Sequence, residues 1–146
     1  MSNRPQRYFT QSEEKKIIEA IGQTELATSG EMKVHVEGSS EQVAFERGVA
    51  LFSELEMENT AQRNGVLFYI AMETHQFAII ADEGINKVVP SGFWNEITDS
   101  MREEFKQGNI VEGIVKGVEQ AGLALKEHFP YQSDDRNEIS NEISTD

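Results

Sequence analysis

Two consecutive apolar segments, residues 64–71 (Asn-Gly-Val-Leu-Phe-Tyr-Ile-Ala) and 76–85 (Gln-Phe-Ala-Ile-Ile-Ala-Asp-Glu-Gly-Ile), constrain the fold of this chain more than any other feature. Nearly every position in both segments is apolar, which is typical of strands that are covered on both faces in the centre of a sheet. The residues between them, 73–76 (Glu-Thr-His-Gln), predict a hairpin turn, so we expect antiparallel neighbours. The second segment ends in two acids and a glycine at 82–84, and open α/β sheets commonly build their sites where strands end.

The remaining periodic segments predict helices and one further strand. Residues 31–37 alternate apolar and polar side chains, and because one face is polar throughout, we expect an edge strand. Predicted helices run from the capping box at Thr10 and Glu13 to about Leu26, over 43–57, from an N-cap at Ser91 to 107, and from an N-cap at Asn109 to about 129. This order predicts a three-layer α/β/α sandwich, with a mixed sheet and helices on both of its faces.

Composition limits the number of domains and the classes of partner. The chain has 146 residues, enough for one domain over residues 10–131, after a short arm at 1–9. Residues 132–146 are acidic and rich in serine and asparagine, so we expect a disordered tail. The net charge of −13 argues against a nucleic-acid partner, and the absence of cysteine excludes disulfides and thiolate metal sites.

No part of the sequence predicts insertion into a membrane or export. No apolar run approaches the ~20 residues of a membrane span. The first ten residues include arginines but no apolar segment of the kind that a signal peptide requires. The sequence therefore predicts a cytoplasmic protein without a membrane span.

The acids that follow the second apolar segment are the strongest candidates for metal ligands. Calcium takes six to eight oxygen ligands, and Asp82, Glu83 and the nearby backbone could supply about three of them. Alternatively, Asp82 caps the following turn and Glu83 is solvated. Glu31, at the start of the predicted strand 31–37, would face the same site if that strand runs beside the Asp82 strand; otherwise it is a solvated acid.

Other polar residues give weaker signals. Asp99 and Glu103 are four residues apart on a predicted helix, so they either share a cation with this site or form a solvated acidic face. Asn64 either offers an oxygen to a metal or shapes a turn. Arg63 either binds a substrate phosphate or pairs with a local acid. The three histidines show no metal-ligand spacing.

Four motifs, in this order and spacing, resemble the TPM domain family, and specifically a soluble bacterial member of it. They are residues 29–36 (Ser-Gly-Glu-Met-Lys-Val-His-Val), 63–67 (Arg-Asn-Gly-Val-Leu), 77–85 (Phe-Ala-Ile-Ile-Ala-Asp-Glu-Gly-Ile) and the glycine-containing segment 105–130. The resemblance implies an αβα sandwich with a groove above the sheet and a divalent-cation site, commonly taken as calcium. Some plant members are described as acid phosphatases. Many members carry a signal peptide and a membrane anchor, neither of which the residues of this sequence predict.

Three functions remain open from the sequence. The first is a TPM-like domain that binds a divalent cation, Ca²⁺ before Mg²⁺, in a groove at the C-terminal edge of the central strands, through Glu31, Asp82, Glu83, Asp99 and Glu103. The second is a metal-dependent acid phosphatase acting on a small phosphate ester, although no convincing nucleophile is visible. The third is an interaction module whose groove receives a protein partner.

Overall fold

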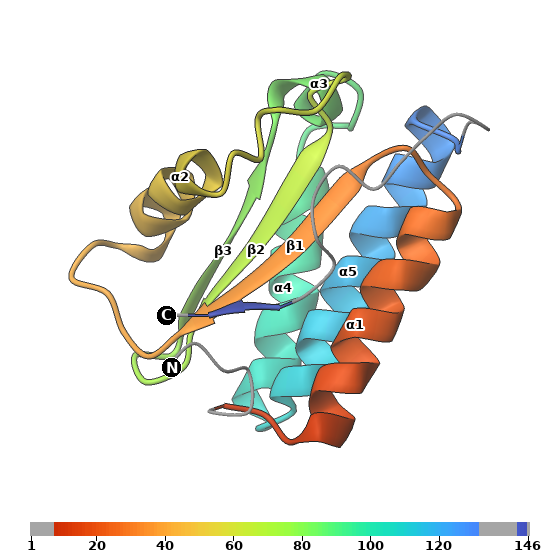
Figure 1. The fold of residues 1–146 in the computed structure, drawn as a ribbon. Helices are drawn as coiled ribbons and strands as arrows, with labels where there is room; N and C mark the ends of the chain where they lie inside the picture. The colour runs from red at the N-terminus through yellow and green to blue at the C-terminus, as the bar shows by residue number, and fades with distance from the viewer. Residues whose placement is uncertain (1–7, 132–142, 146) are drawn as a thin grey trace.

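The computed structural model describes residues 8–131 and 143–145, which form a mixed sheet between two layers of helices (Figure 1). The described strands lie in the order β3-β2-β1-β4. They are β1 (Glu31–Glu37), β2 (Gly65–Ala71), β3 (Gln76–Ala81) and β4 (Ser144–Thr145). β2 is parallel to β1 and antiparallel to β3, and β4 is parallel to β1. The predicted hairpin between β2 and β3 is therefore confirmed.

Helices cover both faces of the sheet, which confirms the predicted three-layer architecture (Figure 1). One face carries α1 (Gln11–Leu26), α4 (Phe93–Lys106) and α5 (Ile110–His128), and the other carries α2 (Ala44–Glu54). A single turn, α3 (Glu83–Asn86), follows β3 directly. None of the helices in the described part of the chain is long and apolar enough to cross a membrane.

The alternation of side chains along β2 produces two separate apolar clusters. Phe68 and Ile70 belong to the large cluster beneath the three-helix face, whereas Leu67 and Tyr69 belong to a smaller cluster with α2. All seven residues of β2 are buried, as the unbroken apolar sequence predicted. β2 is thus the central strand that fixes the rest of the sheet.

The predicted positions of β1 and β3 in the sheet were wrong. β1 lies between β2 and β4, and all seven of its residues are buried, because its polar face is covered and hydrogen-bonded rather than solvated. β3 is the edge strand among the described residues, and its side chains are mostly half-buried. Its residues are apolar because both faces of β3 are covered: Ile80 packs against α2, and Phe77 packs against the large cluster. Coverage of both faces does not require a neighbouring strand on both sides.

Most predicted element boundaries lie close to those in the structure. The capping box at Thr10 and Glu13 is present. α2 is shorter than the predicted helix at both ends, and α4 begins after Gly92, whose φ of 84° ends the preceding turn, rather than after Ser91. β4 contradicts the predicted disorder for residues 144–145, while residues 132–142 and 146 of the predicted tail, and 1–7 of the arm, lie outside the described residues.

Candidate functional site

Asp82 directly follows β3, and neighbouring groups hydrogen-bond to both oxygens of its carboxylate. Arg63 donates to both of its oxygens, from Nε at 2.7 Å and from Nη2 at 2.9 Å. The backbone N–H of Glu83 also donates to Asp82, at 2.7 Å, so Asp82 caps α3. Glu83 itself is largely exposed and reaches Arg63 at 3.4 Å. Of the alternatives that the sequence left open, the structure shows Asp82 as a helix cap and Arg63 as the partner of a nearby acid.

The loop before β2 presses closely on α3, which explains the glycine after the two acids. A Cβ atom on Gly84 would lie 2.1 Å from the carbonyl oxygen of Gln62 and 2.5 Å from that of Arg63. The N–H of Gly84 donates to the Arg63 carbonyl at 2.8 Å. Arg63 has a left-handed backbone with φ of 52°, so its side chain is presented to Asp82 by a turn. Asn64, buried and hydrogen-bonded through its backbone to Thr60, continues this turn.

Glu31 and Asp82 lie at the same end of the sheet, but β1 does not run beside the Asp82 strand, because β2 separates them. That end is also not the C-terminal end of the central strands. Glu31 pairs with Gly65, and the Asp82 N–H donates to the Gly65 carbonyl at 3.0 Å, so the three residues form one row. Because β3 is antiparallel to β2, the end of β3 meets the beginnings of β1 and β2. The predicted groove at a common C-terminal edge was wrong for this topological reason.

An acid that the sequence analysis missed, Glu25, lies beside Glu31. Glu25 accepts a hydrogen bond from the Met32 backbone at 3.2 Å and is hydrogen-bonded to Glu31, which is only 3% exposed. Burial, followed by repulsion from Glu31, raises the pKa of Glu25 to about 8, although Lys33 opposes the shift. The two carboxyl groups therefore hold a proton between them at neutral pH. The position of Glu25 in the last turn of α1 is the only sequence signal that it would face the start of β1.

The other two predicted ligands are not brought to this edge. Asp99 and Glu103 are exposed on α4, and Asp99 pairs with Arg102 at 3.2 Å. Within residues 8–131 and 143–145, no group of three or more histidine or acidic side chains is positioned to hold a metal ion. This end of the sheet thus presents the hydrogen-bonded carboxyl pair of Glu25 and Glu31 and a separately paired Asp82, rather than a complete coordination sphere.

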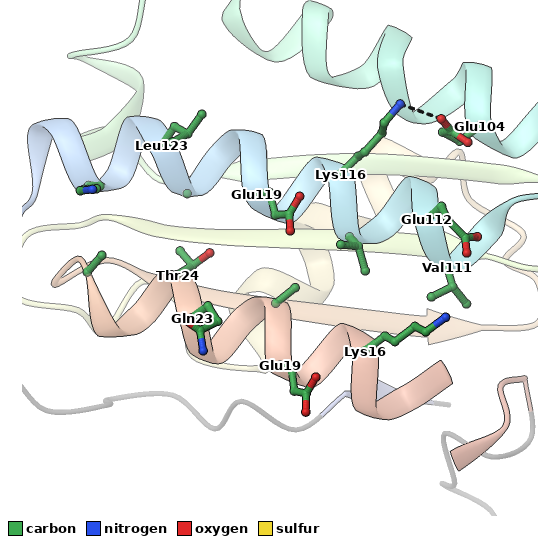
Figure 2. A pocket seen from close by; sticks show the side chains of 15 residues that line it. Lys16, Glu19, Gln23, Thr24, Glu104, Val111, Glu112, Lys116, Glu119 and Leu123 are labelled. Atoms are coloured by element: carbon green, nitrogen blue, oxygen red, sulfur yellow. Dashed lines mark hydrogen bonds and ion pairs between the residues drawn. The ribbon is translucent and has the colours of Figure 1, made fainter. Parts of the chain in front are cut away.

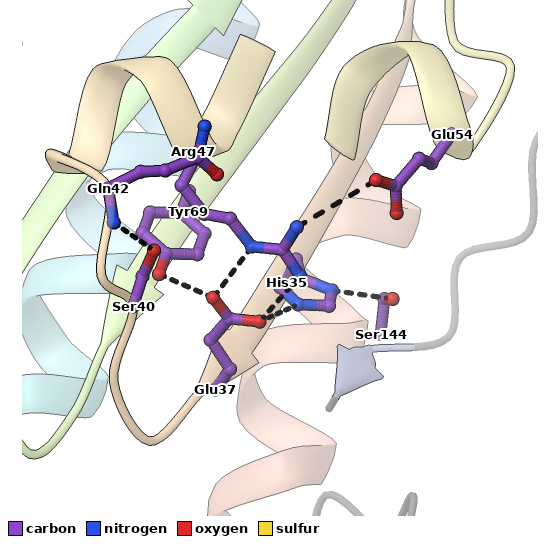
Figure 3. A network of polar contacts seen from close by, with 8 residues as sticks. All are labelled: His35, Glu37, Ser40, Gln42, Arg47, Glu54, Tyr69 and Ser144. Carbon is purple, nitrogen blue, oxygen red and sulfur yellow. Dashed lines mark hydrogen bonds and ion pairs between the residues drawn. The ribbon is translucent and has the colours of Figure 1, made fainter. Parts of the chain in front are cut away.

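A second polar cluster lies at the true carboxyl ends of the parallel strands β1 and β2 (Figure 3). Its centre is Glu37, which accepts hydrogen bonds from Arg47 at 2.9 and 3.1 Å, from Tyr69 at 2.6 Å, and pairs with His35 at 3.2 Å. Burial raises the pKa of Glu37, but hydrogen bonds from Arg47, Tyr69 and His35 outweigh it and lower the pKa to about 2. Burial and then the same carboxylate raise the pKa of Tyr69 well above its ordinary value.

The cluster also reaches the C-terminal strand. The Nδ1 atom of His35 lies 2.8 Å from the hydroxyl of Ser144 in β4, and the His35 ring stacks on Tyr69 with centroids 6.1 Å apart. The alternation of β1 puts His35 and Glu37 on one face, which the sequence did show. The partners come from β2, α2 and β4, and nothing in the local pattern of β1 identifies them.

A groove of about 960 Å³ lies on a different part of the molecule, along α1 and α5 (Figure 2). Its lining mixes both signs of charge, with Lys16 and Lys116 near Glu19 and Glu119. Lys116 pairs with Glu104 at 2.6 Å, and that hydrogen bond lowers the pKa of Glu104. Because both lysines and glutamates line the groove, its charge does not favour a ligand of one sign.

Comparison with known proteins identifies the family to which this chain belongs. The family model of the TPM domain matches residues 2–124, so the chain belongs to the TPM domain family, as its motifs suggested. The NMR structure of the BA42 protein from the psychrophilic bacterium Bizionia argentinensis is 44% identical in sequence, with 100% of each chain covered and a TM-score of 0.89. No curated protein matches the chain.

Proposed function

We propose that this TPM domain binds a divalent cation, Ca²⁺ before Mg²⁺, at the edge of the sheet where β1 begins. The observation that carries the proposal is the pair formed by Glu25 and Glu31, two hydrogen-bonded acids of which one has a pKa raised to about 8. Two carboxyl groups held together repel each other once both are ionised. A hard cation that replaces the shared proton would relieve this repulsion and accept the oxygen ligands that both groups offer.

Further oxygens near this edge support the proposal. Glu58, in the loop that leads to β2, has a buried carboxylate oxygen without a hydrogen-bond partner in the described structure, and its charge is close enough to act on Arg63. Glu31 and Asp82 lie two strands apart, roughly 10 Å between their Cα atoms, which is within reach of one ion held by both side chains. Arg63 would have to release Asp82 before Asp82 could bind the same ion. Glu25 and Glu31 are therefore the main proposed ligands, and Asp82 is an additional one.

A titration of the metal-stripped chain with CaCl₂ and then MgCl₂, followed by amide NMR, tests the proposal. We expect localised shifts at Glu25, Glu31 and Met32 that saturate at micromolar to millimolar Ca²⁺. Glu31→Gln should weaken binding at least tenfold. Asp99→Asn, which removes the same charge from an exposed position, is the matched control and should leave the affinity unchanged. If Ca²⁺ causes amide shifts of equal size in Glu31→Gln and in Asp99→Asn, the proposed site is wrong.

The raised pKa of Glu25 adds a pH dependence that a surface site would lack. Because the cation displaces a proton, apparent affinity should rise with pH up to about 8 and level off above it. Below that pKa the affinity should fall up to tenfold for each pH unit. Glu25→Gln should remove this slope, whereas a slope that persists in the variant would show that another group is titrating.

The acid phosphatase activity that the family resemblance implies stays a hypothesis, and it depends on the same ion. Arg63, which the sequence left open as either a phosphate ligand or the partner of a local acid, is held by Asp82 in this structure. Calcium-dependent hydrolysis of p-nitrophenyl phosphate that Glu31→Gln abolishes would support the activity. Hydrolysis that is indifferent to both the ion and the variant would indicate a contaminating enzyme.

A further inference from the structure

β3 is an edge strand of the described sheet, and its sequence has none of the features that usually protect such an edge. Natural edge strands are commonly blunted by charged side chains, proline or a bulge, which prevent pairing with another chain. Residues 76–81 (Gln-Phe-Ala-Ile-Ile-Ala) contain no charged residue and no proline, and their register with β2 is unbroken. An edge of this composition is suited to pairing with a further strand.

The backbone groups of Phe77 and Ile79 point away from β2. The Asp82 N–H donates to a β2 carbonyl at 3.0 Å, and residues of an antiparallel pair alternate between facing the partner strand and facing away from it. Phe77, Ile79 and Ala81 therefore face outward. The Ala81 carbonyl accepts a hydrogen bond from the Asn86 side chain at 3.0 Å. Within the described part of the chain, the outward N–H and C=O groups of Phe77 and Ile79 face no neighbouring strand.

The exposed flank of α2 extends the apolar surface past this edge. α2 packs mainly against β3, and Figure 1 shows it on the β3 side of the sheet. Phe45 and Val49 are one turn apart on α2 and are 61% and 45% exposed. Arg47, on the opposite flank of the helix, reaches Glu37 in β1. Phe45 and Val49 therefore point the other way, beyond β3.

The opposite side of the edge is bordered by α4, which carries four acidic and two basic residues. Arg102 lies over the Phe77 ring, with its Cζ atom 5.6 Å from the ring centroid. Arg102 pairs with Asp99 at 3.2 Å, and the exposed Glu103 follows it in the helix. Val43 meets Phe77 and Arg102 around a pocket of about 270 Å³ at the start of β3. A strand beside β3 would thus meet apolar side chains towards α2 and an excess of acids towards α4.

We propose that the edge of β3 from Phe77 to Ile79 is a docking site for an extended segment of a partner protein in which apolar residues alternate with lysine or arginine. The main chain of the segment would add a strand to the sheet, and its alternate side chains would give specificity. Its apolar residues would pack on Phe45 and Val49, and its basic residues would face the acids of α4. The net charge of −13 favours a basic partner and opposes pairing of this edge with a second copy of the chain.

Amide exchange, measured by NMR on the full chain with the acetylated and amidated peptide Val-Lys-Val-Lys-Val-Lys-Val, tests the proposal. The N–H groups of Phe77 and Ile79 should gain at least tenfold protection at millimolar peptide. Those of Ala78 and Ile80 already face β2 and should not change. The matched peptide Val-Glu-Val-Glu-Val-Glu-Val should protect none of these groups. The lysine peptide methylated on every backbone nitrogen should also have no effect, because it cannot donate hydrogen bonds to β3.

Two substitutions separate the α2 contact from the backbone contact. Phe45→Ser should weaken binding of the lysine peptide at least fivefold, because it removes apolar surface while the edge of β3 stays intact. Leu123→Ser is the matched control, since Leu123 is 70% exposed on α5, and it should leave binding unchanged.

Three results would overturn the proposal. The first is equal protection by the lysine and glutamate peptides, and the second is no protection by either. The third is protection of Phe77 and Ile79 that appears without peptide and grows with protein concentration, which would identify a second copy of the chain as the occupant.

Discussion

Replacing Glu37 with glutamine tests whether the polar cluster at the carboxyl ends of β1 and β2 stabilises the fold through the charge at its centre. The Glu37 carboxylate is 3% exposed and receives hydrogen bonds from Arg47 and Tyr69 and a contact from His35. Glutamine has nearly the same shape but carries no charge, and its amide donors would face the donors of Arg47. The substitution therefore removes the charge-assisted bonds while it keeps the volume of the side chain.

The magnitude follows from the pKa of the carboxyl group. A decrease from the ordinary value of 4.5 to about 2 corresponds to roughly 3 kcal/mol of folding free energy at neutral pH. Since the native pKa is the lower one, this stability is fully present above pH 4.5 and is lost as the pH falls towards 2. About 2 kcal/mol of it should already be gone at pH 3.

Urea unfolding at pH 7, 5, 4 and 3 measures this difference between the natural chain and Glu37→Gln. We expect the variant to be roughly 3 kcal/mol less stable at pH 7, and the gap to narrow as the pH falls, because only the natural chain gains a proton. Glu54→Gln is the matched control, since Glu54 is 62% exposed and lies 3.8 Å from the same arginine. It should change stability by less than about 0.5 kcal/mol. A gap for Glu37→Gln that stays constant with pH would refute the electrostatic argument.

Two further substitutions test the opposite edge of the sheet. The pKa of Glu25 is raised to about 8 in the folded chain, so the natural chain loses stability as the pH rises from about 5 to 8. Glu25→Gln should remove most of this pH dependence. Thermal unfolding at pH 5.5 and 8 would show the natural chain, but not the variant, less stable at pH 8. Gly84→Ala should cost about 1–3 kcal/mol in urea unfolding because its Cβ would overlap the Gln62 carbonyl, whereas Gly22→Ala, where no atom lies within 4 Å, should not destabilise α1.

Local sequence patterns were sufficient for the elements but not for the arrangement of the strands. The capping box at Thr10, the β2–β3 hairpin and the apolar stripe of α5 depend on residues close together in the chain, and all three are present. The parallel pairing of β1 with β2 joins segments separated by a helix and a loop. That pairing decides which strand ends lie together, so the sequence could not tell that β2 separates Glu31 from Asp82, or that the end of β3 meets the beginnings of β1 and β2.

The polar face of β1 shows why alternation alone could not distinguish an edge strand from an internal one. Alternating polar residues satisfy their hydrogen bonds either with water or with partners from distant segments, and the sequence of the strand is the same in both cases. Here the partners are present at both ends: Glu25 beside Glu31, and Arg47 and Tyr69 around Glu37. A buried polar group without such partners would cost about 1–3 kcal/mol, so a strand with four of them on one face is tolerated only where tertiary structure supplies the partners.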